Sequence, residues 1–409
     1  MQSTAPVAFL LVSLLALVSA ASSSIQKRSF SVDRVANPNF AGRNGHNALA
    51  KAYRKFGMVV PQGLADTLAA QNTKRSENGT KQTGTVEADP KKNDVEFLSP
   101  VTIGGQKLNL DFDTGSSDLW VFNTQLGADA TAGHIIYDPS QSNTFAAMEG
   151  AQFLINYGDG SGAEGNVGTD VVDVGGASVQ AQAVELATAV TDTFVKDQKN
   201  DGLMGLAFSK LNNVKPQKQK TFFDNVMPSL DEPLFTADLR KGAAGAYTFG
   251  TVDTSKFEGD LTWIPVNTTR GFWQFSSEQF AVDGGTVQNA TPGGQAIADT
   301  GTTLILADQK IVQGYYSQVQ GARRNRASGS ITVPCDATLP DLDLDVGGTY
   351  MARIAGSDLN FSPVGRGNCF GGLQASPLGG LSIYGDIFFK SQFVAFNGGN
   401  NTLGIAPHK

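Results

Sequence analysis

Short runs of Val, Ile, Leu, Phe and Thr recur along most of the chain and are separated by Gly, Asn and Asp. This pattern is typical of β-strands joined by tight turns, so it predicts a mostly β fold. The run from Val101 to Leu110 is interrupted by Gly104 and Gly105, which predicts a hairpin. A second hairpin is predicted around residues 157–161, where the turn sequence Tyr-Gly-Asp-Gly-Ser lies between apolar runs.

The first part of the chain departs from this β pattern. An apolar run from Val7 to Val18 precedes small residues, which predicts a signal peptide over residues 1–20. The run is too short to cross a bilayer, and no later run is long and apolar enough, so we expect secretion and no membrane partner. A buried N-terminal helix is the alternative interpretation of this run. The segment from Ala48 to Phe56 is rich in helix formers and predicts a helix.

Charge divides the chain into a basic leader and an acidic body. Residues 1–75 carry nine Lys and Arg and two acids, a net charge of +7, so the remainder carries −14 and the whole chain −7. These opposite charges predict an electrostatic clamp between leader and body, with a merely solvated leader as the alternative. An acidic body also argues against nucleic acid as a partner. Because the basic pair Lys74-Arg75 ends the leader, we expect a pro-segment over residues 21–75 and a mature protein from Ser76.

Cysteine usage is consistent with secretion. Cys335 and Cys369 are the only cysteines, which predicts one disulfide, with two free buried thiols as the alternative. Two Cys and three His form no cluster with zinc-ligand spacing, so we expect no metal and no cofactor. The candidate glycosylation sites in Asn-x-Ser/Thr sequons are Asn78, Asn267, Asn289, Asn360 and Asn400.

The tripeptide Asp-Thr-Gly occurs twice, beginning at Asp113 and at Asp299, each time after an apolar stretch. Each copy places a carboxylate where a strand ends and a tight turn begins. Like charges about 3 Å apart do not both ionise readily, so two such carboxyl groups brought together would share a proton and activate a water molecule. A Ser-His-Asp arrangement is poorly supported, because beyond the leader the chain contains only His134 and His408.

The similarity between the two halves extends beyond the tripeptide. Leu203-Met204-Gly205 follows Asp113, and Ile383-Tyr384-Gly385 follows Asp299 at a similar distance. Two similar halves that each contribute one Asp imply a bilobal body with pseudo-two-fold symmetry. We expect an N-terminal lobe with a flap over residues 76–255 and a C-terminal lobe over residues 256–409.

These motifs together resemble those of the pepsin-like aspartic proteases, and most closely those of the secreted acid proteases of filamentous fungi. The resemblance covers most of the chain after the leader and rests on residues 113–121, 157–161, 200–208, 299–303, 383–386 and 403–407. It implies a mostly β, bilobal pepsin-like acid protease fold, with an active-site cleft between the lobes. A lone disulfide in the second half is also similar to the fungal branch.

The resemblance implies a role for each residue around the two tripeptides. Asp113 and Asp299 are expected to be catalytic. Thr114 and Thr300 are expected to bond across the two loops and to hold the pair rigid.

The next residues of each copy are expected to support the same pair. Ser116 and Thr302 would donate hydrogen bonds to the outer carboxylate oxygens, and Thr302 would also contact the substrate. Gly115 and Gly301 would leave room for water and substrate close to the backbone.

The hairpin at residues 157–161 corresponds to the flap of the family. Tyr157 is expected to close over the substrate while Trp120 bonds to its hydroxyl group. Asp159 is expected to let the enzyme accept Lys, besides large apolar residues, before the cut, although a solvated turn acid is the alternative. Phe194 and Met204 are expected either to line the same pocket or to pack in the core. The flap residues expected to bind substrate are Tyr157, Gly158, Asp159 and Ser161.

The sequence therefore predicts a secreted aspartic endopeptidase, made as a zymogen, that hydrolyses peptide bonds in proteins at acid pH. We expect polypeptide substrates, a monomer, and a pro-segment that inhibits its own enzyme through Lys51 or Lys55, one of which would lie between the two carboxylates. A catalytically inactive pepsin fold that serves as a binding or inhibitor protein is the alternative. An adhesive or lectin-like β-protein would explain neither the duplication nor the basic leader.

Overall fold

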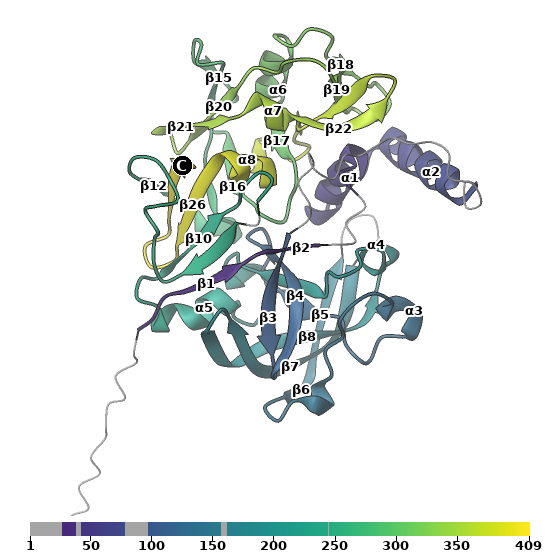
Figure 1. Ribbon diagram of the computed structural model, residues 1–409, viewed down its shortest axis with the longest axis vertical. Coiled ribbons are helices and arrows are strands. Elements are labelled where there is room, and N and C mark those ends of the chain that lie inside the picture. The colour runs from purple at the N-terminus through teal and green to yellow at the C-terminus, as the bar shows by residue number, and fades with distance from the viewer. Residues whose placement is uncertain (1–26, 38–41, 78–96, 157–161, 244) are drawn as a thin grey trace, which may run out of the picture.

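The computed structural model describes residues 27–37, 42–77, 97–156, 162–243 and 245–409. Most of its regular structure is β, which confirms the fold class predicted from the apolar pattern. Figure 1 shows the strands of the first half, in blue and teal, gathered below those of the second half, in green and yellow. Within the described part of the chain, no helix is long and apolar enough to cross a membrane.

The first half is built on one large sheet. In spatial order, its strands are β2 (Val35–Ala36), β3 (Phe97–Ile103), β4 (Gln106–Asp113), β9 (Gly202–Gly205), β5 (Leu119–Val121), β8 (Ala177–Val190), β7 (Gly162–Val174) and β6 (Ala146–Asn156). An additional pairing of β3 with β7 closes six of these strands into a ring.

Both predicted hairpins are confirmed by this sheet. Ile103 pairs with Gln106 across Gly104 and Gly105, whose φ angles of 53° and 81° suit glycine. Asn156 of β6 pairs with Gly162 of β7, so the chain reverses between these two residues.

The second half contains three smaller sheets. The five-stranded sheet runs β13 (Gln274–Ser276), β16 (Gln295–Ala298), β25 (Leu381–Tyr384), β17 (Ile305–Ala307) and β24 (Leu373–Ala375). One four-stranded sheet runs β15 (Gln288–Asn289), β14 (Gln279–Val282), β20 (Leu342–Val346) and β21 (Tyr350–Ile354). The other runs β18 (Arg323–Arg324), β19 (Ile331–Pro334), β23 (Asn368–Gly371) and β22 (Asn360–Gly365).

The two halves repeat one arrangement of strands. In the first, β4 is parallel to β9, β9 is antiparallel to β5, and β5 is parallel to β8. In the second, β16, β25, β17 and β24 follow one another with the same directions. The apolar motifs that follow each Asp-Thr-Gly in the sequence are therefore equivalent strands, β9 and β25.

A six-stranded sheet joins the two halves. Its order is β1 (Phe30–Asp33), β11 (Ala246–Phe249), β10 (Leu234–Asp238), β26 (Gln392–Asn397), β27 (Thr402–Pro407) and β12 (Thr262–Pro265). Aromatic side chains pack along this sheet, and Tyr247 of β11 meets Phe112 of β4, the strand that carries the first tripeptide, with ring centroids 5.0 Å apart. Phe235 stacks on Phe396 with ring centroids 4.6 Å apart, and Trp273 meets Phe396 edge-on at 5.2 Å. Burial of such large rings contributes strongly to core stability.

Helices are short outside the leader. The α-helices are α1 (Gly45–Lys55), α2 (Gln62–Glu77), α3 (Ala128–Thr131), α4 (Asp192–Val195), α5 (Phe222–Val226), α6 (Gln309–Tyr316), α7 (Gly356–Leu359) and α8 (Asp386–Ser391). The 3₁₀ turns are η1 (Pro139–Gln141), η2 (Ser209–Leu211), η3 (Met227–Ser229) and η4 (Thr268–Arg270).

The predicted leader helix is present as α1, but it begins three residues earlier than the helix-forming run. Asn44 explains this start, because its side chain accepts a hydrogen bond from the backbone N–H of Asn47 at 3.1 Å. The helix ends at Lys55, before Gly57 at a φ of 66°. The second leader helix, α2, was not predicted.

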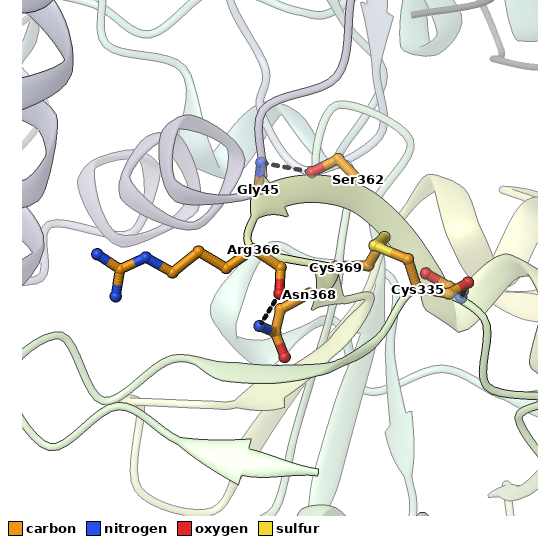
Figure 2. Close-up of a disulfide and its surroundings, with 7 residues drawn as sticks. Gly45, Cys335, Ser362, Arg366, Asn368 and Cys369 are labelled. Atoms are coloured by element: carbon orange, nitrogen blue, oxygen red, sulfur yellow. Dashed lines mark hydrogen bonds between the residues drawn. A yellow bond between two sulfur atoms is a disulfide. The ribbon is translucent and has the colours of Figure 1, made fainter. Parts of the chain in front are cut away.

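The leader packs against both halves of the body. Its strand β1 pairs with β11 of the shared sheet, and β2 pairs with β3 of the large sheet. At the start of α1, the backbone N–H of Gly45 donates to Ser362 Oγ at 3.1 Å, as Figure 2 shows. A Cβ on Gly45 would lie 2.1 Å from the ring of Phe370, so a larger residue would not fit there.

The disulfide between Cys335 and Cys369 lies below this contact in Figure 2, and Cys369 pairs with Pro363, the residue after Ser362. Its prediction from the cysteine count is confirmed, and no cysteine remains free. The pairing follows from the sheet, because β19 and β23 are antiparallel neighbours and place Pro334 opposite Asn368.

Candidate active site

Asp113 and Asp299 meet at the ends of two equivalent strands. Asp113 ends β4, and Asp299 follows β16. Both side chains are almost fully buried. The Nζ of Lys55 lies 2.7 Å from Asp113 Oδ1 and 2.6 Å from Asp299 Oδ1, so one ammonium group contacts the inner oxygens of both carboxylates. The fold thus brings together two residues that are 186 positions apart.

The two threonines bind reciprocally across the loops, as the sequence predicted. Thr114 Oγ1 donates to the carbonyl of Ala298 at 2.9 Å, and Thr300 Oγ1 donates to the carbonyl of Phe112 at 2.7 Å. Each hydroxyl also accepts the other threonine's backbone N–H, at 3.0 and 3.1 Å. These four bonds connect the two halves directly beneath the carboxylates and fix their positions.

The donors to each carboxylate are arranged symmetrically. Ser116 Oγ donates to the outer oxygen of Asp113 at 2.6 Å, and Thr302 Oγ1 donates to the outer oxygen of Asp299 at 2.5 Å. The backbone N–H of Gly115 donates to the inner oxygen of Asp113 at 2.8 Å. Gly301 does the same for Asp299 at 3.1 Å. All four donors favour the ionised form of the carboxyl group.

The glycines of both tripeptides allow each loop to lie close to the carboxylate of the opposite half. A Cβ on Gly115 would lie 2.4 Å from Asp299 Oδ1, and a Cβ on Gly301 would lie 2.5 Å from Asp113 Oδ1. Any side chain at either position would therefore push the opposite carboxylate away. The sequence interpretation assigned this space to water and substrate, whereas in this structure the opposite Asp borders it.

The two carboxyl groups differ in their titration. Burial raises the pKa of Asp113, but the charge of Lys55 and hydrogen bonds from Lys55 and Ser116 outweigh it and leave that pKa below its ordinary value. Burial raises the pKa of Asp299 to about 6. The charge of Lys55 lowers this pKa, and the charge of Asp113 raises it further. The pair therefore holds one proton more readily than two separate carboxylates would.

The sequence model of the eukaryotic aspartyl protease family matches residues 96–408. The chain belongs to this family. An aspartic protease of this kind is a hydrolase of peptide bonds. Within the described residues, no group of His, Cys, Asp and Glu side chains could hold a metal ion.

Several fungal relatives resemble this protease over nearly its full length. The aspartic protease PEP3 of Coccidioides posadasii is 48% identical over 399 residues, which cover 93% of this chain and 90% of that protein. Penicillopepsin-1 of Penicillium rubens is 43% identical over 397 residues and 96% of each chain. Aspergillopepsin-1 of Aspergillus flavus is 45% identical over 359 residues, 87% of this chain and 85% of that protein. All three alignments are longer than residues 96–408, so they include part of the leader.

Among the described residues, two neighbouring pockets share Lys55. One is lined by the leader residues Lys51, Arg54 and Lys55, by Asp111 and Asp113, and by Trp120, Thr193, Phe194, Asn200, Gly202, Leu203 and Gly301. The other is lined by Lys55, Phe56, Gly115, Ser116, Ser117, Asp118, Ile155, Leu203, Leu211, Asn213, Arg270, Phe272, Leu378 and Leu381. Helix α1 therefore lies along a cleft that passes over the two carboxylates.

Not all of the residues predicted to line or support the substrate pocket are found there. Phe194 lines the first pocket and meets Trp120 edge-on at 4.9 Å. Met204 is fully buried in β9, so its alternative interpretation as a core residue is the one that the structure supports. Trp120 Nε1 has no hydrogen-bond acceptor among the described residues. The flap residues Tyr157, Gly158, Asp159 and Ser161 lie outside those residues.

The candidate glycosylation sites differ in exposure. Asn267, Asn289 and Asn400 are exposed. Asn360 is half-buried, and its Nδ2 donates to the carbonyl of Cys335 at 3.0 Å, which makes it a poorer acceptor site. Asn78 lies outside the described part of the chain.

Sequence reasoning did not single out Asp111 or the buried acids Asp118 and Glu185. The strand period could have indicated Asp111, because residues two apart in a strand face the same side and Asp113 follows at that spacing. Glu185 gave no such signal, since it lies on β8, far along the chain from Asp118.

Proposed function

We propose that this protease is a secreted endopeptidase, made as an inactive precursor, that cleaves proteins at acid pH through Asp113 and Asp299. The observation that supports this proposal best is the contact of both inner carboxylate oxygens with one ammonium group in the cleft. A small polar group fits at that point, and in the enzyme without its leader a water molecule would take the same position.

Hydrolysis would then proceed by general acid–base catalysis. The ionised carboxylate of the pair takes a proton from the water as the water attacks the scissile carbonyl carbon. The protonated carboxyl polarises the carbonyl oxygen and stabilises the tetrahedral diol. A proton then passes to the leaving nitrogen, and the C–N bond breaks. Because the pair titrates as a unit, neither Asp is assigned as the acid or the base.

The hydrogen bonds around the two carboxylates support this mechanism of hydrolysis. The hydrogen bonds from Ser116 and Thr302 hold the outer oxygens, so the inner oxygens remain directed at the attacking water. The threonine bonds fix the separation of the carboxylates. Positioning of this kind lowers the reorganisation needed in the transition state.

Conservative replacement of each Asp tests the proposal. We expect Asp113→Asn and Asp299→Asn to reduce casein cleavage at pH 4 by at least about 10³-fold, because an amide cannot exchange the proton. Asp260→Asn, which changes an exposed acid, is the matched control and should cleave at the wild-type rate. Wild-type cleavage by either active-site variant would refute the proposed mechanism.

In the precursor, Lys55 would inhibit the enzyme by occupying the position of the water. Its side chain is only 9% exposed, and the two carboxylates raise its pKa above the ordinary value against the effect of burial. Of the two lysines predicted for this role, Lys55 is the one that reaches the carboxylates. Because Lys55 holds the pKa of Asp113 down, protonation of the pair at low pH removes this attraction and favours release of the leader.

A precursor with Lys55→Ala should therefore convert to the mature form faster than the wild-type precursor. The variant loses the ion pairs of Lys55 with Asp113 and Asp299, which predicts a rate increase of at least about tenfold at pH 5, measured by electrophoresis. Lys310→Ala, which changes an exposed lysine of the body, should convert at the wild-type rate. An unchanged rate for Lys55→Ala would argue against the inhibitory role.

We further infer that residues 1–20 are a signal peptide, that residues 21–75 are the pro-segment, and that the mature enzyme begins at Ser76. The lobes would divide near residue 255, and the mature enzyme would be a monomer. Helix α2 runs through Lys74-Arg75, so cleavage there requires this turn of helix to open. N-terminal sequencing of the secreted protein tests the position of the cut.

The substrate preference would combine apolar and basic side chains. Trp120, Phe194 and Leu203 form an apolar wall beside Asp113, which suits a large apolar residue next to the cut. The flap acid Asp159 is proposed to bind Lys before the cut.

A further inference from the structure

His134 lies with both of its ring nitrogens against backbone carbonyl oxygens. Its Nδ1 is 2.8 Å from the carbonyl oxygen of Asn200, and its Nε2 is 3.2 Å from that of Val195. A carbonyl oxygen only accepts hydrogen bonds, and a neutral imidazole carries one N–H, so a neutral His134 satisfies only one of these contacts. Both contacts become hydrogen bonds when the ring is doubly protonated and carries a positive charge.

The surroundings of the ring suit this charged form. The imidazole stacks on Phe122 with ring centroids 3.9 Å apart, and a cation is attracted to an aromatic face. Residues 128–138 and 192–201, which contain the ring and its carbonyl partners, carry more acids than bases. The acids are Asp129, Asp138, Asp192, Asp197 and Asp201, and the bases are Lys196 and Lys199.

Asp201 is the buried acid of this group. It accepts a hydrogen bond from the backbone N–H of Ile135, the residue after His134, at 2.7 Å. Burial raises the pKa of Asp201, while backbone hydrogen bonds and the charge of His134 lower it. A positive ring therefore meets an aromatic face on one side and a buried carboxyl group nearby.

The two carbonyl partners of His134 lie at the two ends of residues 195–200. Helix α4 ends at Val195, and Lys199 has a φ of 73°, in the left-handed region. A residue with a side chain keeps such a conformation only where surrounding contacts hold it. The backbone N–H of Lys199 donates to the carbonyl of Gly133 at 3.2 Å, and His134 binds both ends of the segment.

This segment connects the histidine with the cleft. Phe194 and Asn200 line the first pocket, and Asn200 Oδ1 accepts the backbone N–H of Gly202 at the start of β9 at 3.3 Å. His134 is not one of the described residues that line this pocket. Any effect of its charge on the cleft therefore passes through the segment that it holds.

In the precursor, the leader adds a contact to the same segment. Asn37 Nδ2 donates to the carbonyl of Gln198 at 3.1 Å, and Lys51 and Arg54 line the same pocket as Asn200. The bond from Asn37 needs no added proton, so it supports the segment at any pH. Removal of the leader takes this bond away and leaves the contacts of the body, those of His134 among them.

We propose that His134 is a positioning residue that holds residues 195–200 against the body while its ring is doubly protonated, and that the segment loosens when the ring loses a proton. Only the effect on cleavage rests on the proposed endopeptidase function. Histidine side chains change charge between about pH 5 and 8, so the contact is complete in acid and is lost as pH rises. The mature enzyme would thus keep this part of its cleft firm only at acid pH.

Hydrogen exchange of the full precursor tests this role. Asp113→Asn prevents self-digestion, and Asn37→Ala removes the bond from the leader. In this double variant, we expect the protection of amides 195–200, corrected for the intrinsic rate, to fall by about tenfold from pH 5 to pH 7, the effect of one hydrogen bond. The fall should be smaller when Asn37 is present.

Replacement of His134 in the same background supplies the comparison. His134→Phe keeps the stacking surface without a donor, so protection should be low at pH 5 as well and the pH response should vanish. His408→Gln, which changes the other histidine of the body, should keep the response. Unchanged protection of β7 in each variant shows that the effect is local.

The charge of the ring can be observed without replacing His134. A precursor with His46→Phe, His408→Gln and Asp113→Asn contains His134 as its one histidine, and NMR of the ring nitrogens distinguishes the neutral from the charged form. We expect two N–H groups at pH 5. A neutral ring at pH 5 would overturn the proposal even where His134→Phe fails to fold.

Kinetics of the mature enzyme extend the test to cleavage. At pH 5 we expect His134→Phe to raise the KM of a peptide by about fivefold with kcat little changed, because binding to the cleft is weakened and the carboxylate pair is not. Simple loss of folded enzyme would lower kcat alone. Equal protection of residues 195–200 at pH 5 and pH 7 in the Asn37→Ala variant would refute the role of His134 and leave the endopeptidase function standing. A mature wild type that cleaves no peptide and no protein would refute that function, while the exchange and NMR results would still decide the role of His134.

Discussion

Glu185 and Asp118 are buried acids that meet at the side chain of Asn212. The Nδ2 of Asn212 donates to Asp118 Oδ1 at 2.9 Å and to Glu185 Oε1 at 3.1 Å. Glu185 Oε2 has no donor among the residues that the structure describes. Burial, together with the charge of Asp118, raises the pKa of Glu185 well above its ordinary value. A proton on Glu185 would satisfy both groups, so at the residue scale we expect this pair to stabilise the fold more at acid pH.

The sign of this dependence follows from the raised pKa. The contribution of Glu185 to stability is complete below the ordinary pKa of 4.5 and is lost as pH rises through the higher pKa of the folded state. Glu185→Gln needs no proton, so we expect its Tm to fall less than that of the wild type between pH 4 and pH 7. The two falls in Tm should differ by several degrees, roughly 3–6 °C. Calorimetry on an Asp113→Asn background avoids self-digestion.

Glu232→Gln serves as the control for this experiment, because Glu232 is exposed. Its Tm should fall by the same amount as that of the wild type between pH 4 and pH 7. An equal loss in Glu185→Gln would show that the buried pair does not govern the response.

At the scale of elements, helix α1 combines two functions in one short segment. Its last residue, Lys55, reaches the carboxylates, while His46, Leu49, Ala50 and Ala52 are buried. His46 meets Phe370 edge-on at 5.1 Å, and its Nδ1 has no partner among the described residues. Burial of this face disfavours a charged His46, so docking of the helix is more favourable while His46 is neutral.

His46 should make release of the leader sensitive to pH. Burial lowers the pKa of His46 below the ordinary value of 6.5, so its contribution to docking is present above 6.5 and is lost as pH falls. We expect the His46→Phe precursor, which keeps the aromatic contact without the charge, to convert more slowly than the wild type at pH 5. His46→Arg should convert fastest and should do so even at pH 7.

Electrophoresis of the three precursors over time provides the measurement. At pH 7 the wild type and His46→Phe should convert at the same low rate. A His46→Phe precursor that converts as fast as the wild type at pH 5 would assign the pH response to other groups, such as the carboxylate pair.

At the scale of the whole molecule, two structures hold the halves together. The six-stranded sheet contains strands from both halves, with β10 paired to β26. The reciprocal bonds of Thr114 and Thr300 join the tripeptide loops at the centre. The sheet sets the general placement of the halves, and the threonines set the distance between the carboxylates.

Replacement of Thr300 tests the second connection. Thr300→Val removes one hydroxyl that donates to Phe112 and accepts from Thr114, so we expect a loss of about 2 kcal/mol in the free energy of unfolding. Activity should fall as well, since the carboxylates are no longer held rigidly. Thr300→Ser keeps the hydroxyl and should remain close to the wild type in both properties. Urea unfolding and casein cleavage of the two variants give the comparison, and equal behaviour of Val and Ser would exclude the cross-bond.

Much of the fold could be predicted because local sequence patterns determine it. The hairpin at Gly104-Gly105, the leader helix and the strand endings before each Asp-Thr-Gly depend on neighbouring residues. Helix α2 was missed because its polar residues show little apolar periodicity. Its placement depends on a tertiary contact, since a Cβ on Gly63 would lie 2.3 Å from the carbonyl oxygen of Ala327.

The sequence by itself determined the repeated halves, the paired cysteines and the two acids that carry the expected chemistry, because these are matters of residue type and spacing. Only the tertiary structure decided that Lys55 rather than Lys51 reaches Asp113 and Asp299, and that Asp111 faces the same cleft. It also brought Asp118 beside Glu185. Such contacts join residues far apart in the chain, and their geometry follows from the packing of strands and helices, which short-range periodicity does not encode.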